Sequence, residues 1–502
     1  MKNVSRVFYI TLALVIITVI FGAVFPAQFE GITGSIKSYV ATTFGWYYLL
    51  LMSALVIVAV SISISPWGKI RLGKDGEKPE FSLPTWTAML FSAGMGIGLV
   101  FYGAAEPLFH YLSDSPTAET GSGKAFKEGL VYAYYHWGIH VWAMYGVTAL
   151  ALAFFQFRKG EPGLISTTLK PLFGDKMNGP LGTLIDVLAV FATVFGVATS
   201  LGFGAVQING GLSHLFDVEV GFTSQFFIIT VVTLLFLISA WTGLSKGIKY
   251  LSNTNLVLSV VLLVLVLVIG PTVLILNMFT ETFGMYIQNF IEISFRTAPL
   301  ESDNRSWLDS WTIFYWAWWV SWAPFVGMFI ARVSRGRTIR QFLTGVLTIP
   351  TLLVSIWFAV FGTTSGNIQN KGTELTQYAT ELVLFNMFDQ LPLSLILSLL
   401  AIVLIGSFFI TSADSATFVL GMQSTYGSLL PANRIKIIWG LAQSSVALIL
   451  LYVGGLQAIQ NTIIAAALPF SFVMILMVIA LFKALNEEYK KMEAEEEKKQ
   501  SS

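Results

Sequence analysis

Apolar stretches recur along the whole chain, separated by short polar segments. Many reach roughly 20 residues, the length that an α-helix needs to cross the hydrocarbon core of a membrane. The pattern predicts an all-α, polytopic membrane protein with twelve transmembrane helices. The expected spans are residues 7–25, 46–65, 85–112, 129–157, 181–208, 222–241, 253–276, 309–331, 341–362, 392–423, 435–453 and 460–483.

The basic residues predict the orientation of these spans. With both termini placed in the cytoplasm, only six of the 29 Lys and Arg residues fall in outside segments. Cytoplasmic loops carry an excess of basic residues, so this orientation is favoured. The first apolar run has no small-residue cleavage site, so we expect an uncleaved membrane helix rather than a signal peptide. Four arginines in 332–340 are expected to be an orientation signal, or alternatively partners at an inner gate.

Two polar segments have patterns of their own. Residues 279–298 carry apolar side chains at helical spacing, which predicts an amphipathic helix lying along the outer membrane surface. The tail after Ala484 is nearly all Glu and Lys, and we expect a short solvated cytoplasmic helix or coil.

Composition narrows the function. The chain is 55% hydrophobic and 11% charged, whereas soluble proteins carry about 25% charged residues. It has no cysteine, which excludes disulfides, a thiol nucleophile and thiolate metal ligands. The net charge of +1 gives no indication of nucleic-acid binding. No nucleophile–base set is visible, so we do not expect an enzyme.

Alternating glycines interrupt the span 85–112. Gly94, Gly96 and Gly98 each cost about 1 kcal/mol in a helix relative to Ala, which favours local unwinding. Freed carbonyls of such a segment can bind a cation. The alternative is tight helix packing through small residues.

A second interruption is predicted at Ser321–Pro324, five spans later. Two such breaks fit two five-helix repeats of inverted topology that meet at the bilayer midplane. Thr411 and Ser412 in span 392–423 would then complete an alkali-cation site with carbonyls of span 85–112. The alternative is that their hydroxyls bond to their own helix.

Aromatic residues predict where a substrate binds. Residues 311–322 contain five tryptophans and no charged residue. Indole is a good neutral surface for a cation, and a quaternary ammonium group has no hydrogen to donate. On a continuous helix at about 100° per residue, Trp137, Trp142 and Tyr145 share one broad face. Two aromatic faces meeting across a cavity would form a cage for such a group.

An interfacial aromatic belt is the alternative. It explains Trp318, Trp319 and Trp322 poorly, because they lie about two to three turns into their span.

Ionisable residues within spans are expected to be functional by default. Asp186 and Glu106 are candidates, although Glu106 precedes Pro107 and a helix-end role is the alternative. His136 and His140 lie one turn apart. With no carboxylate or third ligand beside them, packing or hydrogen bonding is favoured over a metal pair or proton relay.

Three segments resemble the signature of the betaine/choline/carnitine transporter (BCCT) family. They are Trp311–Trp319, Gly94–Gly103 and Thr411–Ser415. The resemblance covers essentially the whole chain and is greatest to short-tailed, sodium-coupled glycine betaine transporters of the OpuD type. It implies a leucine-transporter-like fold, with two N-terminal helices before a 5+5 inverted repeat, in a homotrimer assembled partly through the amphipathic helix. It also implies a division of the chain into the two N-terminal helices with a cytoplasmic loop (1–80), the first five-helix repeat (81–276), the amphipathic helix and loop (277–306), the second five-helix repeat (307–484) and the charged tail (485–502).

The resemblance also implies roles for individual residues. Trp137, Trp142, Tyr145 and Trp319 would form the central cage, Trp318 and Trp322 would line the inner route, and Gly94, Met95, Gly96 and Gly98 would border the substrate. One sodium ion would be held by Met95, Phe408, Thr411, Ser412 and the backbone carbonyl of Ser92. Phe325 and Thr193 match a second sodium site, where Val197 replaces an expected hydroxyl.

The implied function is sodium-coupled symport of glycine betaine, or a related zwitterionic quaternary-ammonium osmolyte, into a bacterial cell for osmoprotection. Transport would proceed by alternating access, with sodium ions, lipid and the solute as the only partners and no other cofactor. Transport of choline, carnitine or another solute with different coupling is the alternative; choline is disfavoured because Gly98 and its neighbours supply no carboxylate. An ion channel is the alternative from another class, although channels normally build their pores from symmetric rings.

Overall fold

The computed structural model of the chain describes residues 4–94, 96–242 and 245–500. Within these residues there is no β-strand, only an isolated bridge between Arg71 and Thr338, so the predicted all-α class is confirmed. The helices of the first half are α1 (Arg6–Val24), α2 (Pro26–Ile64), α3 (Leu83–Gly94), α4 (Ile97–Tyr102), α5 (Ala105–Leu112), α6 (Gly123–Trp137), α7 (Ile139–Ala153), α8 (Lys170–Phe173), α9 (Pro180–Phe216), α10 (Phe222–Thr242) and α11 (Ser245–Ile269). Those of the second half are α12 (Thr272–Gln288), α13 (Phe290–Phe295), α14 (Ser302–Ser310), α15 (Thr312–Val333), α16 (Ile339–Asn370), α17 (Thr380–Asp389), α18 (Ser394–Gln423) and α19 (Asn433–Gln500).

The described part of the chain contains nine helical segments that are long and apolar enough to cross a membrane, or ten if one bent pair is a single span. This composition establishes a multi-pass membrane protein. The predicted count of twelve is not reached by this measure for two reasons. The third expected span is divided into the short helices α3, α4 and α5, and the last two expected spans form one helix, α19, kinked at Gly454 and Gly455.

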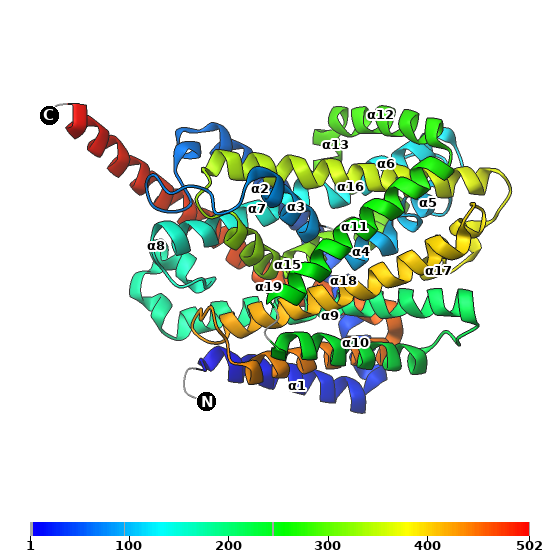
Figure 1. The fold of residues 1–502 in the computed structure, drawn as a ribbon, viewed down its shortest axis with the longest axis horizontal. Helices are drawn as coiled ribbons and strands as arrows, with labels where there is room; N and C mark the ends of the chain where they lie inside the picture. The colour runs from blue at the N-terminus through cyan, green and yellow to red at the C-terminus, as the bar shows by residue number, and fades with distance from the viewer. Residues whose placement is uncertain (1–3, 95, 243–244, 501–502) are drawn as a thin grey trace.

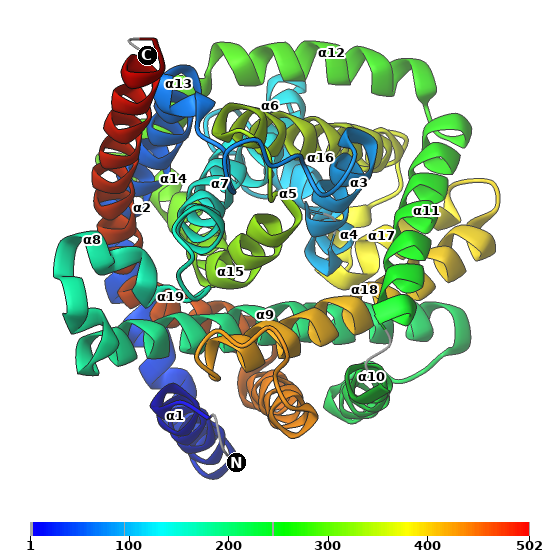
Figure 2. The same ribbon diagram turned by 60° about the vertical axis from the view of Figure 1, so that its left-hand side comes forward.

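Helix α12 turns away from the end of α11 at 109°, as the near-perpendicular ribbons in Figure 2 show. Its inner face is buried, with Tyr134 of α6 within 3.1 Å of Thr282. Its outer face is apolar and exposed at Val273, Leu276 and Ile287. The amphipathic pattern predicted for residues 279–298 is present, but it is divided between two helices: α12 begins earlier, at Thr272, and ends at Gln288, and α13 covers Phe290–Phe295.

The helices are arranged as an inner group surrounded by an outer ring. In Figure 2, α3–α7, α15 and α16 lie inside a ring formed by α2, α9, α11 and α12. Helix α15 packs against α7 and α9, while α9 also packs against α18 and α19. These contacts bring α4, α7, α15 and α18 around one interior space, although they are far apart in the sequence.

One predicted span is broken at a position where no break was predicted. Residues 129–157 were expected to form one helix, but α6 ends at Trp137 and α7 begins at Ile139. Gly138 between them has φ −99° and ψ −132°. A Cβ atom there would lie 2.4 Å from the carbonyl oxygen of Tyr134, so a larger residue does not fit this corner.

The opposite error occurs in α15. The interruption predicted at Ser321–Pro324 is wrong, because the helix continues without a break from Thr312 to Val333. Proline lacks an N–H, so Pro324 leaves the carbonyl of Val320 without its usual helical partner. Such a loss is tolerated in membrane helices when neighbouring helices hold the segment, and both Ser321 and Pro324 are buried here.

The charged tail is helical rather than coil. Helix α19 continues to Gln500, and its C-terminal end projects beyond the rest of the molecule in Figure 1. At the base of this projection, Glu488 accepts hydrogen bonds from Arg158, at 2.7 Å, and from Lys159. The division of the chain into two five-helix repeats stays a prediction.

Candidate substrate-binding site

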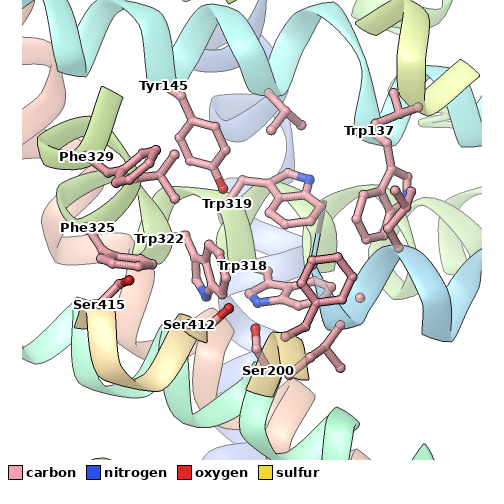
Figure 3. Close-up of a pocket in the computed structure, with 18 of the residues that line it drawn as sticks. Trp137, Tyr145, Ser200, Trp318, Trp319, Trp322, Phe325, Phe329, Ser412 and Ser415 are labelled. Atoms are coloured by element: carbon pink, nitrogen blue, oxygen red, sulfur yellow. The ribbon is translucent and has the colours of Figure 1, made fainter. Parts of the chain in front are cut away.

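An interior cavity of about 140 Å³ lies where α4, α6, α7, α15 and α18 meet. It is similar in size to the cavity of about 150 Å³ that holds benzene in an engineered protein. All six aromatic residues predicted for the site line this cavity: Trp137, Trp142, Tyr145, Trp318, Trp319 and Trp322. The cavity is therefore large enough for a small organic solute and is walled mainly by rings (Figure 3).

The break at Gly138 orients two of these tryptophans. Because the helix ends there, the carbonyl groups of His136 and Trp137 lack their usual helical partners. The indole N–H of Trp319 donates to the carbonyl of His136 at 2.9 Å, and that of Trp142 donates to the carbonyl of Trp137 at 3.2 Å. The prediction that Trp137, Trp142 and Tyr145 share one face of a continuous helix is therefore wrong, because the helix is broken at Gly138. The three side chains nevertheless line the same cavity.

The rings meet at defined angles. Trp137 and Trp319 pack edge to face, with centroids 4.8 Å apart and planes at 72°. Trp318 and Trp319 instead stack in parallel at 4.6 Å and 12°, which leaves no room for a ligand between their faces. A head group would therefore sit beside this pair. The resemblance assigned Trp318 and Trp322 to the inner route. In the structure they line the same cavity as Trp319.

The glycine-rich segment opens the helix as predicted. Helix α3 ends at Gly94 and α4 begins at Ile97, with Gly96 in an extended conformation between them (φ −147°, ψ −176°). Ser92 lies in the last turn of α3, and Met95 lies outside the described residues.

Gly98 lies directly against the indoles. A Cβ atom on Gly98 would come within 2.6 Å of Cη2 of Trp318 and 2.9 Å of Cη2 of Trp137. The absence of a side chain here lets two indole rings approach the backbone of α4.

Several polar groups of the cavity wall have no partner. Tyr145 Oη, Ser200 Oγ and Trp318 Nε1 are buried and make no hydrogen bond to any described residue. A buried polar group without a partner costs about 1–3 kcal/mol, so these atoms can bind a polar ligand. The hydroxyls of Ser412 and Ser415 also point toward the ring cluster (Figure 3).

Sequence reasoning missed two of these hydroxyls, Ser200 and Ser415. Ser415 follows Thr411 by four residues, so helical spacing on α18 was a usable signal. Ser200 lies in an apolar stretch of α9 that gave no signal.

Three predicted sodium ligands reach this cavity: Phe408, Thr411 and Ser412 line it together with Gly96. The Thr411 hydroxyl lies 3.0 Å from the carbonyl of Ser407 in its own helix, which is the alternative that the sequence left open. It also accepts a hydrogen bond at 3.0 Å from the amide of Asn255 on α11, a residue that sequence reasoning missed.

The second predicted sodium site is less well assembled. Phe325 lines the cavity, but Thr193 is not among the lining residues. The Thr193 hydroxyl is buried and donates to the carbonyl of Ala189 at 2.8 Å, within its own helix. Val197 is also fully buried.

The buried acids differ in their surroundings. Asp186 accepts hydrogen bonds from the backbone N–H and the hydroxyl of Ser166, at 2.9 and 2.7 Å, and so fixes a loop. Glu106 instead lies 2.7 Å from Nδ1 of His136, so the expectation that no carboxylate stands beside that histidine is wrong. Glu106 lies in the first turn of α5, which agrees with its helix-end alternative, and its side chain is fully buried. His140 makes the hydrogen bond that was favoured for it, to Ser294 at 2.9 Å.

Comparison with known proteins identifies the chain's relatives. Residues 6–490 match the sequence profile of the betaine/carnitine/choline family transporters, BCCT. The chain belongs to this family. As a BCCT transporter, it is a multi-pass membrane protein that moves a solute, and it is not an enzyme.

Individual relatives are similar over nearly their full length. The glycine betaine transporter OpuD of Bacillus subtilis is 55% identical over 497 residues, which cover 99% of this chain and 97% of OpuD. An ectoine/hydroxyectoine transporter of Virgibacillus pantothenticus is 44% identical, covering 98% of this chain and 99% of that protein. A probable glycine betaine transporter of Desulfitobacterium hafniense is 41% identical, covering 97% and 99%.

Proposed function

We propose that this BCCT transporter takes up glycine betaine, or a closely related zwitterionic quaternary-ammonium solute, by sodium-coupled symport. The observation that carries the proposal is the aromatic cavity with unpartnered polar atoms in its wall. Each ring facing a desolvated cation contributes about 0.5–2 kcal/mol. The similarity to a glycine betaine transporter over the whole chain points to the same solute class.

The two ends of a betaine suit different parts of this cavity. Its trimethylammonium group offers no hydrogen-bond donor, so ring faces and shape would select it. Its carboxylate needs donors, which Trp318 Nε1 and the hydroxyls of Ser200 and Tyr145 supply. Relatives named for betaine and for ectoine support a compatible solute, and betaine is the better match for a cage of rings.

Sodium coupling rests on the hydroxyls of α18. Thr411 and Ser412 line the cavity together with Gly96, which lies between the end of α3 and the start of α4. Backbone carbonyls at such a helix break can bind a cation. Phe408 and Met95 would complete this site, with Ser92 contributing its carbonyl. Phe325 and Thr193 are the residues proposed for a second ion. Two sodium ions moving through 100 mV with a neutral zwitterion would supply about 4.6 kcal/mol, or roughly 2,000-fold accumulation.

We also propose a transport mechanism, a cellular location and an oligomeric state, each by analogy with the BCCT family. Alternating access around the cavity would move the solute, with the two predicted repeats rocking against each other. We place the protein in a bacterial plasma membrane with both termini in the cytoplasm, because most of its basic residues lie in segments on that side. We also propose a homotrimer in which the exposed apolar face of α12 takes part.

Uptake of radiolabelled glycine betaine into transport-deficient bacterial cells tests the proposal. We expect saturable uptake in sodium medium and little in choline-free potassium medium. Undiminished uptake in potassium would contradict sodium coupling, and no uptake in either medium would contradict the substrate. Ionic currents without bound solute would favour a channel.

Choline is a second candidate, because one observation favours it. The sequence disfavoured choline for want of a carboxylate near Gly98, yet Glu106 lies behind Trp137, with its carboxylate 2.9 Å from the indole nitrogen. Competition binding to the purified protein separates the two solutes. We expect glycine betaine to displace choline, and the reverse order would contradict the betaine assignment.

A further inference from the structure

A fully buried carboxylate stands directly behind the aromatic wall. One oxygen of Glu106 accepts hydrogen bonds from Trp137 Nε1, at 2.9 Å, and from the hydroxyl of Tyr315, at 2.6 Å. The other oxygen faces Nδ1 of His136 at 2.7 Å and Nε2 of His110 at 3.4 Å. Glu106 and both histidines are completely buried. The carboxylate of Glu106 thus faces four side chains, and one of them, Trp137, is a ring of the cavity wall.

Neutral forms of both histidines can direct an N–H group at Glu106. Nδ1 of His110 accepts from the indole N–H of Trp307 at 3.1 Å, so a neutral His110 carries its proton on Nε2, facing Glu106. His136 directs Nδ1 at Glu106, and its Nε2 pairs with the hydroxyl of Thr312 at 2.9 Å. The structure records no Lys or Arg ion pair for Glu106 within the residues it describes. When both histidines are neutral, no basic side chain among the described residues cancels the negative charge of Glu106, and the hydrogen-bond donors around the carboxylate solvate it.

The partners of Glu106 are parts of the ring assembly. Trp137 packs edge to face on Trp319 at 4.8 Å, and Tyr315 stacks on Trp319 at 5.8 Å and 18°. A carboxylate that fixes both rings therefore holds one ring of the cavity wall, Trp137, and one ring that supports Trp319 from behind the wall, Tyr315. In a water-poor interior its charge also acts over a longer distance than in water.

We propose that Glu106 is a positioning and specificity-determining residue of the transport site. It holds Trp137 and Tyr315 in place, and its charge makes the cavity prefer a cationic head group over a neutral one of the same shape. This inference rests on the proposed function, because it concerns the same cavity. It differs from a metal site at Glu106, His110 and His136, because His136 is already hydrogen-bonded to Glu106 and Nδ1 of His110 already accepts from Trp307.

The test compares two ligands of one shape. Glycine betaine and 3,3-dimethylbutanoate differ only in the central atom of the head group, which is a quaternary nitrogen in one and a carbon in the other. Both are titrated calorimetrically into purified full-length protein in sodium buffer. We expect the wild type to prefer glycine betaine and Glu106→Gln to lose at least tenfold of that preference, or about 1.4 kcal/mol. A purely structural role would weaken both ligands equally and leave the ratio unchanged, which would overturn the proposal.

Two further variants keep the test sharp. Asp186→Asn also removes a buried acid, but one bonded to Ser166 outside the cavity wall, so its ligand ratio should stay within twofold of the wild type. Glu106→Asp keeps the charge on a shorter side chain, so affinity should fall while the ratio is retained. Loss of the ratio in Glu106→Asp would overturn the proposal, and this holds even if Glu106→Gln does not fold.

Failure of the proposed function is recognised separately. If wild-type protein binds choline but not glycine betaine, the betaine assignment is wrong. The same comparison is then made with choline and its carbon analogue 3,3-dimethylbutan-1-ol, with the same expectation for Glu106→Gln. If the wild type binds neither glycine betaine nor choline, both proposals are overturned.

Discussion

The indole N–H of Trp319 donates to the main-chain carbonyl of His136 across 2.9 Å. This bond joins the middle of α15 to the end of α6, at a carbonyl that is free because the helix stops at Gly138. The same corner provides the acceptor for Trp142 at the next carbonyl. The aromatic wall therefore depends on a helix break as well as on its aromatic residues.

Gly138→Ala tests this dependence. The added Cβ would lie 2.4 Å from the carbonyl oxygen of Tyr134, so the corner must shift and displace its two free carbonyls. We expect a loss of about 1–3 kcal/mol of stability, the usual cost of overpacking, together with weaker betaine binding. Thermal unfolding and titration calorimetry measure the two effects. The control is Gly284→Ala, where the new atom meets nothing within 4 Å; equal behaviour of the two variants would refute the role of the break.

Gly98→Ala tests the close approach of the indoles to α4. The Cβ would press on Trp318 and Trp137 at 2.6 and 2.9 Å, so we expect both rings to move into the cavity. The dissociation constant for betaine should rise about tenfold, corresponding to ~1.4 kcal/mol. Gly406→Ala on α18 is the matched control, since its Cβ meets no atom within 4 Å. Unchanged affinity in Gly98→Ala would show that these rings do not border the bound solute.

The parts of this site that could be predicted from the sequence are those marked by a pattern within one short segment. The tryptophan cluster of residues 311–322 and the glycines at 94–98 are local patterns, and both pointed to the cavity that the structure contains. The break at Gly138 was missed because a single glycine among apolar and aromatic residues does not interrupt the hydropathy. Pro324 gave the opposite error, because packing around α15 keeps the helix continuous.

Contacts between residues far apart in the sequence could not be predicted from the sequence. Glu106 and His136 are separated by 30 positions and by two helix ends, and no periodicity links them. Asn255 reaches Thr411 across 156 positions. Such contacts follow from how α5, α6, α11 and α18 pack, which composition and spacing do not encode. The count of twelve membrane spans stays a prediction, because the broken helices of the structure do not meet a length criterion for spanning.

Ser200→Ala tests the proposed carboxylate contact. The Ser200 hydroxyl is buried at the cavity and has no partner in the described part of the chain, so its removal should not lower the thermal stability. Betaine affinity should fall by about tenfold, because hydrogen bonds to charged groups contribute about 1.5–3 kcal/mol. Thr199→Val is the matched neighbour, since that hydroxyl donates to the carbonyl of Phe195 in its own helix. Calorimetry showing equal affinities in both variants and the wild type would contradict the contact.

Thr411→Val tests sodium binding on α18. The change removes a hydroxyl beside the unwound segment and keeps the side-chain shape, so the sodium concentration for half-maximal uptake should rise at least about threefold. Thr417→Val serves as the control, because the Thr417 hydroxyl is fully buried and donates to the carbonyl of Asp414 away from the cavity. An unaltered sodium dependence in Thr411→Val would remove this residue from the ion site.

Trp319→Leu is the most direct test of the central claim that rings from α6, α7 and α15 hold a cationic head group. Leucine keeps an apolar side chain but removes the ring that contacts Trp137, Tyr315 and Trp318. We predict that the purified variant stays folded and that its dissociation constant for glycine betaine rises at least about thirtyfold, or ~2 kcal/mol. Trp46→Leu, at a tryptophan that is 53% exposed, should bind like the wild type. Wild-type affinity in folded Trp319→Leu would contradict the account.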